Sequence, residues 1–323
     1  MTRSHTLLDD AQQRGASAGL ATGAGGEAPK LLLRVDGDEV WIDTLQEHDE
    51  PGAHVLVKFP RRTGRVRMSG QAKDTEVDRL VLVTESVYYR ALAALGISTI
   101  DVSRMHLRMT HDERPSLWMP RFDVEERNGE TMRFGMESLY ALTDTPPGAH
   151  KPHQAYLDAL HRVLIEGLPL TSVDPARPHT SGPRSAELVS EYIQRDLLNV
   201  IFGNSDNHGR NTSILKTPEE AWLAPIYDFA PMVIDPAGII RSTRWGQLER
   251  GANDIDWRGV CAQQTHLVDP EEIWADLRAL AERLIDLDER LESLGLPDEA
   301  LNHPQLKLRQ VNQRLRRWDL VAA

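Results

Sequence analysis

Two nearby segments of the chain concentrate residues that could carry out phosphoryl transfer. Residues 202–213 read FGNSDNHGRNTS, and residues 223–230 read LAPIYDFA. Phosphoryl transfer needs a carboxylate that accepts the proton of the attacking hydroxyl, and oxygen ligands that hold magnesium on the phosphates. Asp206 and Asn211 stand five residues apart, the separation of base and metal-binding Asn in the kinase catalytic loop, and Asp228 follows as a further oxygen ligand. The spacing therefore predicts a site for ATP and Mg²⁺ with these three residues at its centre.

Two other interpretations of the first segment stay open. Asn, Asp and Gly are the commonest turn formers, so the string is also compatible with a hydrogen-bonded turn that has no catalytic role. The order Asp206-Asn-His208 also suggests a metallohydrolase, but the sequence shows no accompanying cluster of His and carboxylates elsewhere. The order and spacing of the polar groups favour phosphoryl transfer over both.

Lys58 is the second candidate functional residue. It lies in the apolar run HVLVKF at 54–59, and lysine is scarce in this chain, where most cations are arginine. A lysine in an apolar strand loses its hydration and needs an acidic partner or an anionic ligand. Glu85 on the following predicted helix is the candidate partner, as in the Lys–Glu pair of kinases. The alternatives are a Lys58 side chain that reaches the solvent from an edge strand and a Glu85 on the surface.

The stretch 15–30 is rich in glycine and alanine. Such a composition is typical of a flexible linker. Its position before a predicted hairpin and before Lys58 instead favours a loop that covers a nucleotide, since glycines let backbone N–H groups approach phosphates. Gly25, Gly26 and Lys30 are the candidate contacts, and the pattern GxxxxGK[ST] of the P-loop is absent.

The elements expected around these residues divide the chain into two lobes. Strands are predicted at 31–35, 39–42, 54–59, 105–110 and 117–122, with Asp36-Gly37 as a hairpin turn, a loop at 61–80 and a helix at 85–95. Apolar spacing predicts long helices at 186–202, 271–294 and 304–318, the first of them ended by Gly203. We therefore expect an α+β fold with a β-rich lobe over 1–121 and a helical lobe over 122–323.

Composition restricts the class of protein. The net charge of −12 disfavours direct binding to nucleic acid, and no apolar run is long enough for a membrane span. Cys261 is the only cysteine, which excludes an intramolecular disulfide and cysteine-rich zinc sites. These features fit a cytoplasmic protein.

The strings AGGEAPK, HVLVKF, ESVYYRALAALGI, PRFD, GNSDNHGRN and LAPIYDFAPM occur in the order seen in HipA-like serine/threonine kinases, the toxins of bacterial toxin–antitoxin systems. The sequence resembles this family from about residue 14 to residue 235. The resemblance implies a two-lobed protein-kinase-like fold, Asp206 as catalytic base, Asn211 and Asp228 as magnesium ligands, and Lys58 on the phosphates. The remaining nucleotide contacts that it implies are Met119, Arg121 and Phe122 beside the adenine, and His208 and Tyr227.

The resemblance also implies a biological setting. The substrate is expected to be a translation component such as an aminoacyl-tRNA synthetase, and the partner a helix-turn-helix antitoxin like HipB. The short stretch before the Gly-rich segment resembles the shortened HipT branch, in which a separate small protein, HipS, supplies a missing subdomain. Autophosphorylation of Ser17, or secondly Thr22, would add negative charge to the Gly-rich loop and inhibit the kinase. A nucleotide-binding pseudokinase and a small-molecule kinase are the alternatives.

Overall fold

The computed structural model describes residues 30–43, 52–60, 71–109, 114–127, 130–146, 148–167, 185–251 and 254–322. The chain forms two compact units, Met1–Arg133 and Phe134–Ala323, and each unit is described by itself. The boundary between residues 121 and 122 that the sequence suggests stays a prediction. Within the described residues, no helix is long and apolar enough to cross a membrane.

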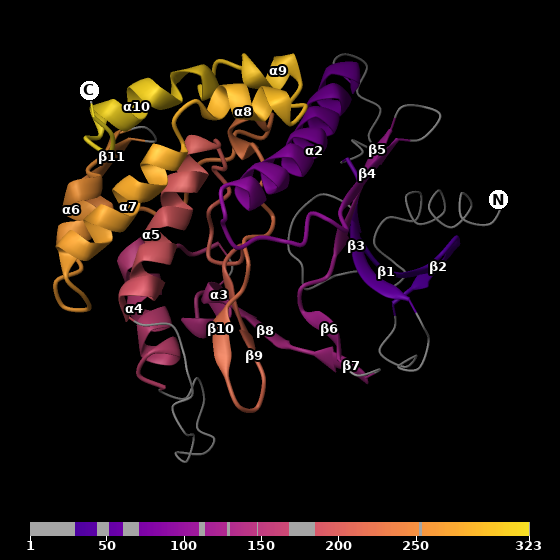
Figure 1. Ribbon diagram of the computed structural model, residues 1–323, viewed down its shortest axis with the longest axis horizontal. Coiled ribbons are helices and arrows are strands. Elements are labelled where there is room, and N and C mark those ends of the chain that lie inside the picture. The colour runs from indigo at the N-terminus through magenta and orange to yellow at the C-terminus, as the bar shows by residue number, and fades with distance from the viewer. Residues whose placement is uncertain are drawn as a thin grey trace. The chain divides into compact units, whose positions relative to one another are not determined.

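The first unit is built on a five-stranded antiparallel sheet in the order β2-β1-β3-β5-β4 (Figure 1). Its strands are β1 (Lys30–Asp36), β2 (Glu39–Ile42), β3 (Ala53–Lys58), β4 (His106–Met109) and β5 (Pro115–Pro120). A separate hairpin joins β6 (Val124–Arg127) to β7 (Glu130–Arg133). One face of the large sheet buries a core of Leu31, Leu33, Val55, Val57, Phe59 and Trp118.

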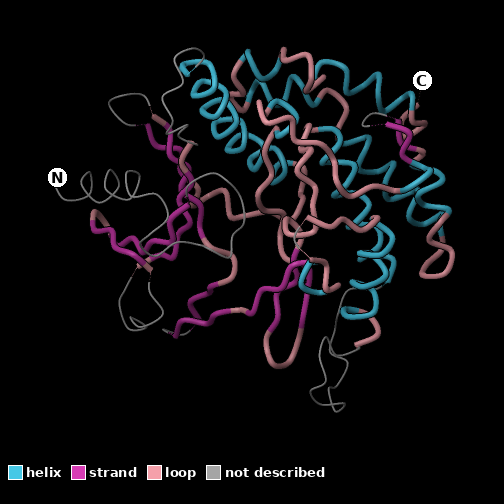
Figure 2. The backbone as a smooth tube through the Cα atoms, turned by 180° about the vertical axis from the view of Figure 1, so that it is seen from behind, coloured by secondary structure: helices cyan, strands magenta, loops and turns pink. Residues whose placement is uncertain are grey.

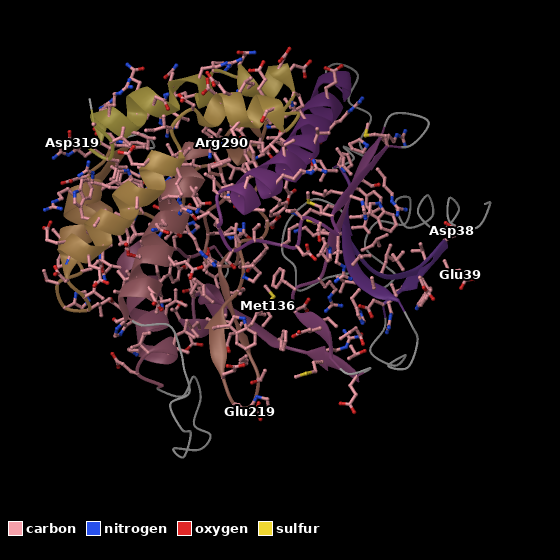
Figure 3. All side chains as sticks on the ribbon, viewed as in Figure 1. Asp38, Glu39, Met136, Glu219, Arg290 and Asp319 are labelled. Carbon is pink, nitrogen blue, oxygen red and sulfur yellow. The ribbon has the colours of Figure 1, made fainter. Side chains whose placement is uncertain are left out.

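The β1–β2 hairpin turns one residue later than the sequence suggests. Asp36 pairs with Glu39, so the two loop residues are Gly37 and Asp38. Gly37 has φ +55°, which glycine adopts without steric cost, so the turn places glycine first and aspartate second. Figure 3 shows Asp38 and Glu39 at the tip of this hairpin.

Helix α2 (Gln71–Ala94) corrects the expectation of a loop over 61–80, as far as the described residues reach. Residues 71–80 are helical although they lack an apolar stripe, because Gln, Ala, Lys, Glu and Leu are good helix formers. The C-terminal half of the helix is buried on nearly every side from Thr84 to Leu92, apart from the half-buried Arg90. Helix α2 contacts β5, and Glu85 in its buried half pairs with Lys58 at the end of β3, so the helix is anchored to the sheet near the strand pair β3–β5.

The second unit is mainly helical, and its helices are among those coloured cyan in Figure 2. Its helices are α3 (Leu139–Leu142), α4 (His153–Leu164), α5 (Ser185–Ile201), α6 (Trp257–Ala262), α7 (Pro270–Arg283), α8 (Leu287–Ser293), α9 (Asp298–Leu301) and α10 (Val311–Arg317). The unit also contains a three-stranded antiparallel sheet in the order β10-β9-β8, made of β8 (Gly135–Ser138), β9 (Ser213–Lys216) and β10 (Ala221–Leu223). A small ribbon pairs β11 (Glu249–Gly251) with β12 (Asp254–Ile255). Figure 3 places Met136 on β8 and Glu219 in the β9–β10 turn.

The long helix predicted over 271–294 is two helices, because Asp286 adopts a left-handed conformation with φ +55° between α7 and α8. Asn312 of α10 stabilises this break: its Oδ1 accepts from the Asp286 amide at 3.0 Å and its Nδ2 donates to the Asp286 carboxylate at 2.7 Å. Leu280, Leu284, Leu287 and Leu291 are buried on both sides of the break, so the apolar spacing continues through it. The helix expected over 304–318 is likewise shorter, with a 3₁₀ turn at Leu308–Gln310 before α10.

Candidate functional site

The loop that carries Asp206 begins where α5 ends. Gly203 has φ +69° and ends the helix as predicted, and a Cβ there would lie 2.6 Å from Leu306. From Ser205 to Arg210 the side chains alternate between buried and accessible, with Ser205, Asn207 and Gly209 buried. The loop therefore has an inner face that fixes its position and an outer face with Asp206 and His208.

The inner face is held by backbone groups of the segment 239–243. Ser205 donates from its hydroxyl to the Ile239 carbonyl at 2.7 Å. Asn207 is held at both ends of its amide, since Nδ2 donates to the Thr243 carbonyl at 2.9 Å and Oδ1 accepts from the Ser242 amide at 3.1 Å. These bonds leave the inner residues little freedom to rotate.

A buried ionic network stabilises the segment that holds the loop. Asp196 on α5 accepts from both terminal nitrogens of Arg241 at 3.1 and 2.9 Å and from the indole of Trp245 at 2.9 Å. Arg241 also donates through Nε to Glu249 at 2.9 Å. His153 lies 3.3 Å from Asp196 and stacks on Trp245 at 4.6 Å between ring centroids. Burial alone would raise the pKa of Asp196, but the positive charge of Arg241 and the contact with His153 outweigh burial and hold that pKa far below its usual value.

The catalytic carboxylate predicted at Asp206 lies on the accessible face, with 30% of its side chain exposed. Its backbone is fixed on both sides: the amide donates to Asn204 Oδ1 at 3.3 Å, and the carbonyl accepts from Asn211 Nδ2 at 2.9 Å. His208 Nε2 lies 3.4 Å from the Asp206 carboxylate. The loop thus joins three of the predicted site residues in one constellation.

The bond from Asn211 to the Asp206 carbonyl also bears on metal binding. Because Nδ2 is used in this bond, the oxygen of the amide remains as the acceptor that could bind a cation. Among the described residues, no group of three or more His, Cys, Asp or Glu side chains could hold a metal ion. An Asn with one carboxylate fits magnesium that arrives with the oxygens of a phosphate and of water, rather than a cation held by protein alone.

Asp228 adopts a left-handed conformation with φ +53°, which is uncommon for a residue with a side chain and is tolerated best by Asn and Asp. Its neighbours are fixed on both sides. Phe229 is buried and packs edge-to-face on Phe202 at 5.4 Å. The Tyr227 hydroxyl lies 2.6 Å from the Ser213 hydroxyl and donates to the Arg210 carbonyl at 2.6 Å, so it links the Asp228 segment to the Asp206 loop. Burial raises the pKa of Tyr227, so this link does not ionise near neutral pH.

Aromatic packing sets the other side of the loop. A Cβ on Gly209 would lie 2.5 and 2.9 Å from the ring of Tyr140 and 2.9 Å from Tyr156, so only glycine fits there. The Tyr140 ring lies 5.9 Å from His208 and below the guanidinium of Arg210 at 5.6 Å. The close approach of the Gly209 backbone therefore positions His208 against an aromatic side chain.

In the first unit the structure brings Lys58 and Glu85 together. Lys58 Nζ lies 2.5 Å from Glu85 Oε1, and the Tyr89 hydroxyl donates to the same oxygen at 3.0 Å. Lys58 and Glu85 are only 5% and 2% exposed, which excludes the alternatives of a snorkelling lysine and a surface glutamate. Lys30, also buried, stands directly opposite Lys58 in the β1–β3 register. Two buried ammonium groups thus lie on neighbouring strands.

Arg121, predicted as a nucleotide contact, belongs to a network of charges. It donates to Asp43 at 2.7 Å and through two nitrogens to Asp123 at 3.0 and 2.6 Å. Asp43 also lies 2.7 Å from His54 Nδ1 and 3.3 Å from Arg133. Burial acts to raise the pKa of Asp43, but the bond to His54 and the charges of His54, Arg121 and Arg133 outweigh burial and lower it to about 2.

The other predicted contacts are placed as follows. Met119 lies in β5 opposite Leu56 of β3, and Phe122 follows this strand. The predicted nucleotide-loop residues and modification sites lie outside the described residues: Gly25, Gly26, Ser17 and Thr22.

Sequence reasoning missed both charge networks. For Asp196 a signal existed, because it lies four residues after Tyr192 on the apolar face of the predicted helix, where a charge needs a partner. Nothing in the local sequence identified Arg241, Glu249 or Asp43 as partners, since they are distant along the chain. Gly209 was read only as a turn former.

Comparison with protein families gives a match to the HipA-like C-terminal domain over residues 22–286. The chain belongs to this family. Among solved structures, the chain is similar to HipA in the Shewanella oneidensis MR-1 complex of HipA, HipB and operator DNA. The TM-score is 0.55 and the identity 17%, and the match covers 94% of the present chain and 68% of the Shewanella chain. The Helicobacter pylori proinflammatory kinase CtkA is also similar, with a TM-score of 0.52 and 12% identity over 93% of this chain and 94% of that chain.

A curated relative from Sinorhizobium fredii carries the name "Putative kinase Y4mE". It is 27% identical to the HipA-like chain over 153 residues, which are 47% of this chain and 33% of the relative. The matched segment thus spans about a third of the relative's length. The structural matches, at these low identities, establish the fold: the α+β architecture predicted from the sequence is confirmed as that of HipA and CtkA.

Proposed function

We propose that this HipA-like chain is a protein kinase that transfers the γ-phosphate of ATP, with Mg²⁺, to a serine or threonine hydroxyl of a protein. The observation that carries the proposal is the loop at Asp206. The carboxylate is accessible, its backbone is bonded on both sides by Asn204 and Asn211, and the flanking residues are buried. This is the arrangement expected of a base that must meet a hydroxyl in a fixed position.

Each site residue then has a role. Asp206 accepts the proton of the acceptor hydroxyl, and Asn211 and Asp228 hold the magnesium. Lys58, oriented by Glu85, binds the phosphates, and Lys30 adds a second cation on the neighbouring strand. When bound, ATP with Mg²⁺ supplies the phosphoryl group and neutralises its charge. The remaining nucleotide contacts in the proposal are Gly25, Gly26, Met119, Arg121, Phe122, His208 and Tyr227.

The biological setting follows from the family. The Shewanella structure contains HipA together with HipB and operator DNA. By analogy, the chain is the cytoplasmic toxin of a toxin–antitoxin system, with a HipB-like helix-turn-helix partner and a small HipS-like protein as a further partner. The DNA contacts of such a complex would come from the antitoxin, since this chain has a net charge of −12. The substrate is a translation component such as an aminoacyl-tRNA synthetase, and phosphorylation of Ser17 or Thr22 inhibits the kinase.

Transfer of labelled phosphate from ATP with Mg²⁺ tests the proposal. The wild-type chain, alone and with a cell extract, is compared with Asp206→Ala and with Asp254→Ala, which removes an exposed aspartate paired with Arg317 at 3.6 Å. Because Asp206 is the base, its loss is expected to lower transfer by on the order of a hundredfold to ten-thousandfold. Asp254→Ala is expected to behave as wild type.

Calorimetric binding of ATP separates the alternatives. Asp206→Ala should bind ATP about as well as wild type, since the base contributes to the transition state rather than to nucleotide affinity. Wild-type chain that binds ATP but labels neither itself nor any extract protein would contradict kinase activity and favour a pseudokinase.

A further inference from the structure

We infer that the surface beside Asp206 recognises acidic residues next to the acceptor hydroxyl, through Arg210 and the neighbouring basic groups His150 and Lys151. This inference rests on the proposed kinase function and names the class of peptide that the site accepts. Arg210, His150 and Lys151 are called the basic rim below.

Two members of the basic rim, Arg210 and His150, lie against one aromatic side chain, Tyr140. Arg210 places its guanidinium 5.6 Å from the centre of the Tyr140 ring. The Tyr140 hydroxyl lies 3.4 Å from His150 Nδ1. The next residue, Lys151, donates from Nζ to the Thr143 carbonyl, so this ammonium is tied to the same linker between α3 and α4. Stacking on an aromatic ring leaves the edge nitrogens of a guanidinium available for an anion.

The basic rim lies at the catalytic loop itself. Tyr140 also faces His208, whose Nε2 lies 3.4 Å from the Asp206 carboxylate. Burial raises the pKa of Tyr140. The positive charge of Arg210 opposes this rise and the negative charge of Asp206 adds to it, so both charges act on the Tyr140 hydroxyl. The four chain steps from Asp206 to Arg210 limit their Cα separation to about 14 Å, a span that an extended peptide covers with about four residues.

The charges of the rim are available to a partner. Arg210 and His150 are exposed, and no carboxylate of the described residues forms an ion pair with Arg210, His150 or Lys151. Asp144, the only carboxylate of the linker 143–152, is exposed and pairs with neither His150 nor Lys151 among the described residues. The chain as a whole has the opposite sign, with a net charge of −12. An acidic peptide would thus be attracted by the basic rim, while the net charge of the chain opposes its binding in general.

Fluorescence anisotropy tests the rim without phosphate transfer. Two short fluorescein-labelled peptides are titrated with the full chain in the absence of ATP. Both contain one serine, which is flanked by glutamates in the first peptide and by glutamines in the second. The glutamate peptide is expected to bind about tenfold more tightly, the order of magnitude of one charge-assisted hydrogen bond, and to lose this advantage in high salt.

Arg210→Ala is expected to reduce the affinity for the glutamate peptide to that for the glutamine peptide. Arg258→Ala is the matched control, because Arg258 is also exposed and lies 5.1 Å over an aromatic ring, that of Trp274, but belongs to α6 and pairs with Glu271 of α7. This control should keep the preference. Thermal unfolding of both variants monitors the fold.

Equal binding of the two peptides by wild type, or a preference that survives Arg210→Ala, would overturn the inference. Arg210→Ala that weakens ATP binding and leaves peptide discrimination intact would overturn it as well, because Arg210 would then bind the nucleotide phosphates. Failure of the kinase proposal has a different signature, namely absence of labelled phosphate on any protein, whatever the peptide affinities are.

Discussion

Two aspartates ten residues apart, Asp196 and Asp206, occupy opposite kinds of surroundings within one unit. Asp196 is 2% exposed and accepts from Arg241 and Trp245 with His153 close by, so its charge is fully compensated. Asp206 is 30% exposed and its contact with His208 is long, at 3.4 Å. Within this unit, positional and chemical roles therefore fall on different residues, which we call the division of labour. Compensated charges hold the segment 239–245 in place, and the loop bonded to that segment presents an accessible carboxylate.

The largest effect on stability is expected from Arg241→Ala. This change leaves Asp196 and Glu249 buried without their guanidinium, and removal of one partner of a buried ion pair costs about 3–5 kcal/mol. Urea unfolding followed by circular dichroism measures the loss. Arg258→Ala, which breaks the exposed pair with Glu271, should cost less than about 1 kcal/mol. Asp206→Ala should leave the free energy of unfolding nearly unchanged and abolish phosphate transfer. Similar losses from both arginine variants would refute the division of labour.

Gly209→Ala tests whether packing as well as charge positions the loop. The added methyl group would overlap the rings of Tyr140 and Tyr156 and is expected to cost about 1–3 kcal/mol and to displace Asp206. Gly251→Ala, where a Cβ meets nothing within 4 Å, is the control. Transfer activity and the unfolding midpoint are measured together. Wild-type activity in Gly209→Ala would show that the contact is not needed.

Asp43 extends the comparison to the first unit, because it also is a compensated, buried carboxylate. Its pKa in the folded chain is about 2, below the ordinary value of 3.8. A depressed folded pKa contributes stability that is present above the ordinary value and lost as the pH falls toward 2, here about 2 kcal/mol. Unfolding of the wild type between pH 5 and pH 2 should show this loss, and Asp43→Asn should be less stable at pH 5 and lack that part of the slope. Parallel curves for the two proteins would contradict the assignment.

Tyr227→Phe is expected to have the smallest effect, about 1 kcal/mol for the lost bonds to Ser213 and the Arg210 carbonyl. Because the hydroxyl joins the segments of Asn211 and Asp228, the variant should need more Mg²⁺ for half-maximal transfer. Ser213→Ala removes only one of the two bonds and should change the Mg²⁺ requirement less. An unaltered Mg²⁺ titration in Tyr227→Phe would show that the two segments are held by other contacts.

The sequence predicted those features that depend on local order. The spacing of Asp206 and Asn211 placed both in one loop, and a lysine within an apolar strand led to the pair with Glu85, now seen at 2.5 Å. The end of α5 at Gly203 followed from the same local logic. Where local signals conflicted, prediction was poorer: the leucine spacing continued through the left-handed Asp286, and the polar start of α2 concealed a helix.

The networks could not be predicted, because their members are far apart in the chain. Asp196 and Arg241 are separated by 45 residues, and Asp43 and Arg121 by 78. A charged residue on the apolar face of a helix indicates that it has a partner, but the local sequence does not identify that partner. The close approach of Gly209 to two tyrosine rings is a matter of packing, which composition and periodicity do not encode.

The alternation of buried and accessible residues along 205–210 has a consequence for how this gene can vary. The buried residues Ser205, Asn207 and Gly209 fix the conformation of the loop, so substitutions there should reduce the amount of folded protein in the cell. In the proposed kinase, Asp206 and His208 serve the reaction and the nucleotide, so substitutions there should leave the amount of folded protein unchanged and abolish the proposed phosphate transfer. A saturation library over residues 205–210 can be sorted separately for protein level and for the growth inhibition expected of the proposed toxin. Loss of protein level and loss of growth inhibition alone should then occur at alternating positions.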